Sequence, residues 1–170
     1  MAIRRATSAD ADAVAALSLD TFDETWGHLY SAQDQDRYKA EAYSPAYYRD
    51  ALDERGCAAW LLEDGDAAIG YVLAGPCGLP HPEVEPGDME LKRLYLRRSA
   101  QNGGWGQRLF AHAEQWLLAN GPASIWIGVW SENHGAQRFY ERHGYVRAGE
   151  YLFAVGEARD REFILRKRLP

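Results

Sequence analysis

The stretch Gln101-Asn102-Gly103-Gly104-Trp105-Gly106 lies between an expected strand, Met89 to Leu96, and an expected amphipathic helix, Gln107 to Asn120. A glycine-rich turn from a strand into a helix presents unpaired backbone N–H groups and the positive end of the helix dipole, which together suit a phosphate. No Gly-Lys-Ser/Thr follows the glycines, and Leu109 stands where a dinucleotide fingerprint has its third glycine. The turn therefore indicates an anion site that is neither a P-loop nor a nicotinamide site.

The length and composition of the chain are those of one globular domain. Its 170 residues are 46% hydrophobic and 26% charged, so we expect a single domain over residues 1–170. There is no run of 18 apolar residues, and Met1-Ala2-Ile3-Arg4-Arg5 leads into a polar helix start and not into an apolar signal core, so secretion is not expected. We therefore expect a cytoplasmic protein with no membrane partner. Cys57 and Cys77 lack metal-ligand spacing and are expected to be buried free thiols, with no metal bound.

Charge is distributed unevenly along this chain, whose net charge is −6. Residues 8–66 carry 14 acidic and four basic side chains, whereas residues 92–108 carry no acidic and five basic ones: Lys92, Arg93, Arg97, Arg98 and Arg108. The basic group coincides with the glycine turn, where positive charge would attract an anion, although most surface charges only solvate a fold. The acidic balance of the whole chain argues against a nucleic-acid partner.

Apolar periodicity and turn signals predict an α/β protein with one mixed sheet and helices on its faces. The expected strands cover residues 2–5, 57–63, 67–74, 89–96, 124–130, 145–155 and 161–169. Helices are expected from Ser8, from Pro45 to about Arg55, from Gln107 to Asn120 and from His134 to Arg142. Asp64-Gly65-Asp66 predicts a hairpin. A single helix connects the strands at 89–96 and 124–130, so we expect these two strands to be parallel neighbours.

Two motifs resemble the GCN5-related N-acetyltransferases (GNAT). The strand Glu90-Leu91-Lys92-Arg93-Leu94-Tyr95-Leu96 followed by Gln101-x-x-Gly104-x-Gly106 resembles the coenzyme-binding motif of that family. A second stretch, Asn133-x-x-Ala136-x-x-Phe139-Tyr140-x-x-x-Gly144-Tyr145, resembles the family's second motif. The resemblance covers essentially the whole chain. It implies a GNAT-like acyl-CoA N-acyltransferase fold, with a mixed sheet of roughly seven strands that splays between the fourth and the fifth.

The resemblance also implies acetyl-CoA as the co-substrate. Backbone N–H groups would hold its pyrophosphate, at Gln101, Asn102, Gly103, Gly104, Trp105 and Gly106. In the strand at residues 89–96, the free edge at Leu94, Tyr95 and Leu96 would pair with the pantetheine arm. Its backbone N–H groups would face the thioester carbonyl. Asn133 would contact the coenzyme or a bound water, or serve only as the N-cap of the helix that follows.

Two side chains are candidates for acid–base chemistry. Tyr140 would protonate the departing thiolate, because phenols and thiols have reference pKa values of about 10 and about 8.5. The alternative for Tyr140 is a core tyrosine that packs beside Phe139. An amine acceptor must lose a proton before it attacks, and Glu90 is the candidate base, directly or through a water; the alternative is an exposed or ion-paired carboxylate.

The acceptor is expected to be a small cationic amine. The segment Thr21-Phe22 and Trp26-Gly27-His28-Leu29-Tyr30 is similar to bacterial polyamine-type acetyltransferases. Phe22, Trp26, His28 and Tyr30, with Glu90, are therefore expected to bind the acceptor. Carboxylates nearby in the sequence would attract its charge, although for most of them the alternative is a solvated acidic face: Asp23, Glu24, Asp34 and Asp36.

Other functions stay open at this level. The acceptor could be a protein N-terminus, a lysine or an aminoglycoside-like amine, although a peptide would need an open groove. A non-enzymatic acyl-CoA-binding regulator on the same fold is a further alternative. The missing lysine and third glycine disfavour a nucleotide-binding module. A homodimer through the C-terminal strands is expected from the family pattern.

Overall fold

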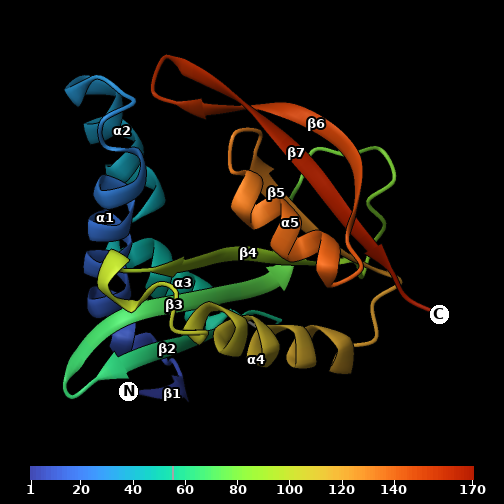
Figure 1. The fold of residues 1–170 in the computed structure, drawn as a ribbon, viewed down its shortest axis with the longest axis horizontal. Coiled ribbons are helices and arrows are strands. Elements are labelled where there is room, and N and C mark those ends of the chain that lie inside the picture. The colour runs from blue at the N-terminus through green and yellow to red at the C-terminus, as the bar shows by residue number, and fades with distance from the viewer. Residues whose placement is uncertain (55) are drawn as a thin grey trace.

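The computed structural model describes residues 1–54 and 56–170, and within them a seven-stranded sheet has the order β1-β2-β3-β4-β5-β7-β6 (Figure 1). The strands are β1 (Ala2–Arg5), β2 (Ala58–Asp64), β3 (Ala67–Pro76), β4 (Met89–Leu96), β5 (Ser124–Trp130), β6 (Val146–Val155) and β7 (Ala158–Arg168). Strands β4 and β5 are parallel, and every other neighbouring pair is antiparallel. The predicted mixed sheet and its parallel pair are confirmed.

The sheet divides between β4 and β5. These strands pair only at their beginnings, where Met89 faces Ile125 and Glu90 faces Trp126. Strand β5 continues instead against β7, from Ser124 to Trp130. The later part of β4 is therefore not paired with β5, and its N–H and C=O groups on that edge are free to bind an extended ligand.

A β-bulge bends β4 at the point where the two strands separate. Leu73 of β3 pairs with Arg93, whereas Ala74 pairs with Leu91, so Lys92 is an extra residue on β4. A bulge increases the local twist and re-aims the side chains around it. Here it turns the second half of β4 away from β5.

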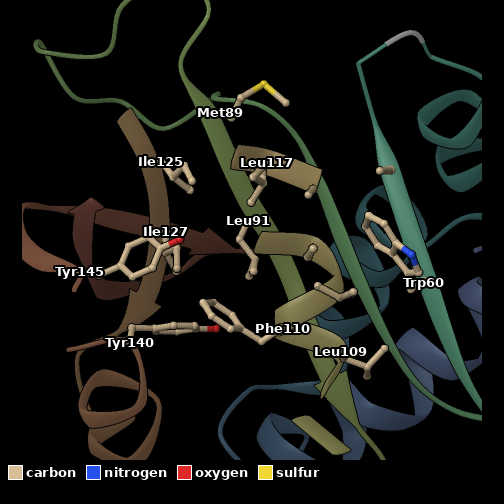
Figure 2. Packing of buried hydrophobic residues seen from close by; sticks show 14 of the residues in the cluster. Trp60, Met89, Leu91, Leu109, Phe110, Leu117, Ile125, Ile127, Tyr140 and Tyr145 are labelled. Atoms are coloured by element: carbon tan, nitrogen blue, oxygen red, sulfur yellow. The ribbon is translucent and has the colours of Figure 1, made fainter. Parts of the chain in front are cut away.

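Helices α4 (Trp105–Ala119) and α5 (His134–Arg142) cover one face of the sheet. The buried stripe of α4 consists of Leu109, Phe110, Ala113 and Leu117, at the spacing of one helix face. Figure 2 shows this stripe packed among residues of β4 and β5, with Tyr140 and Tyr145 beside Phe110. The core on this face joins both halves of the sheet.

The other three helices are α1 (Ala11–Trp26), α2 (Ala32–Ala42) and α3 (Pro45–Asp53). Their apolar side chains form a second core cluster, separate from the one that contains α4 (Figure 1). Single-turn helices occur at Ser8–Asp10 and Arg98–Ala100. Helix α1 has an apolar stripe in which Val14, Leu17 and Phe22 are all buried. None of the described helices is both long and apolar enough to span a membrane.

Several predicted boundaries move by a few residues. Helix α4 begins at Trp105 instead of Gln107, and Gly104 before it adopts a left-handed conformation (φ 76°) that glycine takes without steric cost. Strand β7 begins at Ala158, three residues before the predicted start. Helix α2 was not predicted as a separate element; Ser31 caps it by accepting a hydrogen bond from Asp34 N. The predicted end of α3 at Arg55 lies outside the described residues.

Strands β6 and β7 form a long ribbon whose turn reaches α2 (Figure 1). The N–H of Glu157 donates to Asp34 Oδ1 over 2.6 Å, and Arg37 forms an ion pair with Glu157 at 3.1 Å. The rings of Tyr38 and Phe153 meet edge to face. The ribbon thus connects the second half of the sheet with the helices packed on the first half.

Candidate active site

The glycine turn gathers free backbone donors at the start of α4. The first intrahelical bond runs from Arg108 N to Gly104 O, so the N–H groups of Trp105, Gly106 and Gln107 precede the helical ladder. Within the described residues, the N–H groups of residues 102–104 also donate to no backbone acceptor. Because the N-terminus of a 15-residue helix adds a partial positive charge, this arrangement suits a phosphate.

Of the five basic residues predicted to gather at this turn, Arg108 lies there, with its guanidinium carbon 4.5 Å from the ring centre of Trp105, whereas Lys92, Arg93 and Arg97 are held elsewhere. Arg93 is sandwiched among tyrosines, with its guanidinium carbon 4.7 Å from the ring centre of Tyr47. Arg97 forms an ion pair with Asp20. Alternation along β4 sends these side chains to the α1 side of the sheet. The anion site therefore depends mainly on backbone groups.

A cavity of about 450 Å³ opens where β4 and β5 separate. Its walls come from both sheet halves, from α1, α2 and α5, and from the loop at residues 78–80. Residues expected at the site that line it are Phe22, Trp26, Tyr30, Glu90, Leu94, Tyr95, Asn133 and Tyr140. The structure therefore brings the strand of the first motif, the second motif and the N-terminal aromatic segment to a single cavity, whereas the glycine turn at residues 101–106 is not part of its lining.

Tyr140 projects from α5 into this cavity. Figure 2 shows its ring extending from α5 toward β4, with the hydroxyl at the leading end. The side chain is buried, and burial raises its pKa above the ordinary value for a phenol. Among the described residues, the fully enclosed hydroxyl without a partner is that of Tyr145, not of Tyr140. Tyr140 can therefore hold a proton at neutral pH and present it to the cavity.

Asn133 is the N-cap residue of α5. Its Oδ1 accepts a hydrogen bond from Ala136 N at 3.0 Å, so the N-cap role is confirmed. The residue also lines the cavity. Leu94 and Tyr95 line the cavity from β4. Leu96, at the end of the same strand, packs against the hydrophobic core that contains α4.

Glu90 is buried at the beginning of β4. Its Oε2 accepts hydrogen bonds from Gly78 N at 2.9 Å and from Lys92 Nζ at 3.2 Å. Glu90 and Lys92 are two residues apart and lie on the same side of the strand, where their side chains meet. Glu90 therefore faces the cavity as an ion-paired carboxylate that also holds the loop at residue 78.

Two further carboxylates line the cavity from β7 and were not predicted. Asp160 accepts a hydrogen bond from the hydroxyl of Tyr30, and Glu162 accepts one from the hydroxyl of Tyr151 at 2.8 Å. Burial raises the pKa of Glu162. The signal in the sequence is the alternation Arg159-Asp160-Arg161-Glu162, which places both acids on one face of a strand.

Aromatic rings form the rest of the wall opposite these acids. Phe22 lies at the centre of a cluster with Trp26, Tyr30, Tyr38 and Tyr43, at ring-centre distances of 5.5 to 6.0 Å. Such rings can pack against an alkyl chain and attract a cation through their faces. The cavity thus combines an aromatic wall with carboxylates on the facing strands.

Several predicted acceptor residues lie elsewhere. His28 is exposed in the turn after α1 and does not line the cavity. The predicted acids of the N-terminal region have other partners or positions: Asp23 pairs with Lys39, Glu24 accepts from Arg98 N, Asp34 holds the ribbon, and Asp36 is exposed. Asp23 and Glu24 lie on α1, Asp34 and Asp36 lie on α2, and none of the four lines the cavity, which agrees with the alternative that these acids form a solvated face.

The thiols of Cys57 and Cys77 are free but only half-buried. Cys57 immediately precedes β2 and Cys77 immediately follows β3. Side chains at strand ends are less enclosed than those in the middle of a strand. Within residues 1–54 and 56–170 there is no group of three or more His, Cys, Asp or Glu residues that could hold a metal ion.

Comparison with known proteins identifies relatives of this chain. A family model described as the acetyltransferase (GNAT) family matches residues 14–145. A protein of Lactobacillus delbrueckii subsp. lactis, named as an uncharacterised N-acetyltransferase in the pepI 3′ region, is 32% identical over 155 residues. That alignment covers 91% of this chain and 89% of the relative.

Two solved structures share the fold. The PaiA N-acetyltransferase from Thermoplasma acidophilum, in complex with coenzyme A, superposes with a TM-score of 0.75 at 17% identity, covering 99% of this chain and 98% of the other. The yncA acetyltransferase from Salmonella typhimurium, with its cofactor acetyl-CoA, gives a TM-score of 0.72 at 19% identity, covering 100% and 94%. The expected seven-stranded, splayed acyltransferase fold is confirmed.

Proposed function

Since the chain belongs to the acetyltransferase (GNAT) family and is an acyl-CoA-dependent N-acyltransferase, we propose that it moves the acetyl group of acetyl-CoA to a small cationic primary amine such as a polyamine. The observation that carries this proposal is the cavity between β4 and β5. One of its sides offers free backbone donors and Tyr140, and the other offers aromatic rings and carboxylates.

The coenzyme side fits acetyl-CoA through backbone groups. The free N–H groups of residues 102–106 would hold the pyrophosphate, and Gly104 lets the phosphate approach, because a Cβ built there meets nothing within 4 Å. The unpaired edge of β4 at Leu94, Tyr95 and Leu96 would pair with the pantetheine arm. When bound, acetyl-CoA supplies an activated thioester carbonyl, toward which the N–H groups of this edge would point.

Tyr140 would act as the general acid. Its hydroxyl is protonated at neutral pH, as phenols are, so it can give a proton to the thiolate that leaves, and the burial that raises its pKa makes it a weaker acid than a free phenol. Asn133 would fix the start of α5 and thereby the position of Tyr140, and its location at the cavity allows a contact with the coenzyme.

The acceptor side fits an amine that carries positive charge along an alkyl chain. Phe22, Trp26 and Tyr30 would pack against the chain, while Asp160 would attract a distal ammonium group. The attacking nitrogen must first lose a proton, because alkylamines have pKa values of about 10.4. Glu90 and Glu162 are the carboxylates of the inner cavity that can accept it.

A panel of acceptors tests this proposal. Initial rates of thiol release from acetyl-CoA would be measured with spermidine, spermine, a monoamine of equal length, an aminoglycoside and a peptide with a free N-terminus. The proposal predicts the highest kcat/KM for the polyamines. Equal rates for the monoamine would contradict a cationic acceptor, and tight coenzyme binding without transfer to any amine would indicate the regulator.

A further inference from the structure

Building on the proposed function, we infer that Glu162 of β7, in place of Glu90, receives the proton that the acceptor amine loses before it attacks. Three features of the residue support this role. They are its position beside the gap between β4 and β5, the single hydrogen bond that holds it, and its lack of a cationic partner among the described residues.

Glu162 lies beside the point where the two strands separate. The last parallel pair joins Glu90 to Trp126, so Gly128, two residues further along β5, is level with the bulge at Lys92. A Cβ built on Gly128 would come within 3.2 Å of Glu162 Oε2. The carboxylate therefore occupies the space that the glycine leaves open, directly over the backbone of β5.

This position faces the site proposed for the thioester. Glu162 lies opposite Trp130 in the β5–β7 register, and its side chain is on the same face of the sheet as Gly128. An amine that enters past the aromatic wall of α1 and α2 meets this face before it reaches the free edge of β4 at Leu94. Its ammonium group would therefore meet the Glu162 carboxylate next to the reacting carbon.

Glu90 is held in a different way. A backbone N–H and the ammonium group of Lys92 both donate to its Oε2. Glu162 accepts one hydrogen bond, from Tyr151, and within residues 1–54 and 56–170 it forms no ion pair with a basic side chain. A half-buried carboxylate without a cationic partner incurs a desolvation free energy that no ion pair offsets. An incoming ammonium group would supply that partner. Glu90 is better placed to hold Lys92 and the loop at Gly78.

The electrostatic surroundings of Glu162 agree with proton acceptance. Burial raises its pKa, the hydrogen bond from Tyr151 opposes this, and the charges of Asp160 and Glu90 add to it. The charged and titratable groups that face it are Tyr151 on β6, Asp160 on β7, Glu90, Lys92 and Tyr95 on β4, Tyr38 on α2, and Tyr30 before α2. A carboxylate in such a setting takes a proton more readily than one in water.

The proton balance of the reaction follows from these roles. One N–H bond of the ammonium group breaks, its proton passes to Glu162, and the nitrogen keeps the electron pair. That pair forms the N–C bond to the acetyl carbon, and the electrons of the C–S bond leave with sulfur, which takes a proton from Tyr140. The second proton lost by nitrogen restores Tyr140, and Glu162 returns its proton to water. The products are the amide, the free thiol and one proton.

The Glu162→Gln variant tests this assignment, with saturating acetyl-CoA and whichever primary amine is the best acceptor. We expect kcat to fall about 100-fold or more, and the acidic limb of the kcat–pH profile to disappear, since a general base contributes roughly 10² to 10⁴ in rate. Glu162→Asp should restore part of the rate. Glu150→Gln, the same change on the exposed face of β6, should keep both the rate and the limb. Glu90→Gln should keep the limb.

A second variant reads the environment of Glu162 without removing it. Tyr151→Phe deletes the hydrogen bond that lowers the pKa of Glu162, so the acidic limb should move to higher pH. A purely structural role for Glu162 would alter the folded fraction and leave the limb in place.

Two results would overturn the assignment. One is an acidic limb that survives in Glu162→Gln and vanishes in Glu90→Gln, which would make Glu90 the base. The other is a raised KM for the amine with kcat unchanged, which would limit Glu162 to recognition. If the Glu162→Gln effect holds but polyamines are not preferred, the proposed acceptor fails and the role of Glu162 stands.

Discussion

The two sides of the cavity between β4 and β5 are built in different ways. The coenzyme side consists of backbone groups from one short segment: the edge of β4 in the cavity, and beyond the cavity lining the turn into α4. The acceptor side consists of side chains from distant segments, and its pair of Tyr30 and Asp160 is 130 residues apart. A backbone site is encoded locally, whereas a side-chain pocket depends on how remote elements pack. Changes on the two sides should therefore affect different kinetic constants.

The largest effect is expected where the two sides meet. Tyr140→Phe removes the proposed proton donor and should lower kcat by about 100-fold or more, with coenzyme affinity unchanged. Tyr145→Phe is the matched control, because its hydroxyl is buried without a hydrogen-bond partner among the described residues. Deleting that group should leave kcat intact and cost no stability. Equal losses of rate in both variants would contradict a role for Tyr140 in proton transfer.

A substitution on the coenzyme side should change coenzyme affinity alone. Gly104→Ala places a methyl group in the open space proposed for the phosphate, and we expect the Kd for coenzyme A to rise about tenfold or more. Gly121→Ala is the control, since that glycine also has a positive φ and open space around it. Both variants should lose roughly 1 to 2 kcal/mol of stability from the left-handed conformation. Calorimetric titration would separate the shared strain from the specific loss of binding.

A substitution on the acceptor side should change the KM for the amine alone. Asp160→Asn removes a half-buried negative charge, and the KM for a polyamine should rise about fivefold, because such an ion pair contributes roughly 1 kcal/mol. Asp23→Asn changes an exposed acid that pairs with Lys39 and should leave this KM unchanged. If Asp23→Asn raised the KM for the polyamine and Asp160→Asn left it unchanged, the acceptor would bind at the acidic N-terminal segment instead.

The smallest effect is expected from a substitution that lies on neither side of the cavity and changes only the stability of the protein. Hydrogen bonds from Arg4 lower the pKa of Asp10 to about 2. Its contribution to stability is therefore complete above the unfolded pKa of about 3.9 and is lost as the pH falls through 2. Asp10→Asn should lower the free energy of unfolding by less than about 1 kcal/mol at pH 7 and change it little at pH 2. Both KM values should stay constant, as thermal unfolding and initial rates at several pH values would show.

The fold could be predicted well because its signals are local. Strands β1, β4 and β5 and helix α5 have the predicted bounds, since turn residues and apolar periods mark both ends of each. Helix α2 was missed because none of its side chains is fully buried, so its sequence has no continuous apolar stripe. The reach of the β6–β7 ribbon to α2 depends on contacts between remote residues that no local pattern encodes.

The candidate site could be predicted only in part. Tyr140, Asn133 and Glu90 line the cavity because they belong to short motifs on single elements. Asp160 and Glu162 were missed because a strand with alternating charges is typical of a solvated edge. What makes them functional candidates is the fold, which carries this part of β7 across the cavity to Tyr30.

The central claim is that both sides act together, so the acetyl group passes directly from coenzyme to amine. Initial rates measured while acetyl-CoA and the best amine are varied together test this most directly. Direct transfer predicts double-reciprocal lines that intersect, because both substrates must be bound before any product leaves. Parallel lines would contradict the account, because they would mean that the protein itself takes the acetyl group before the amine binds.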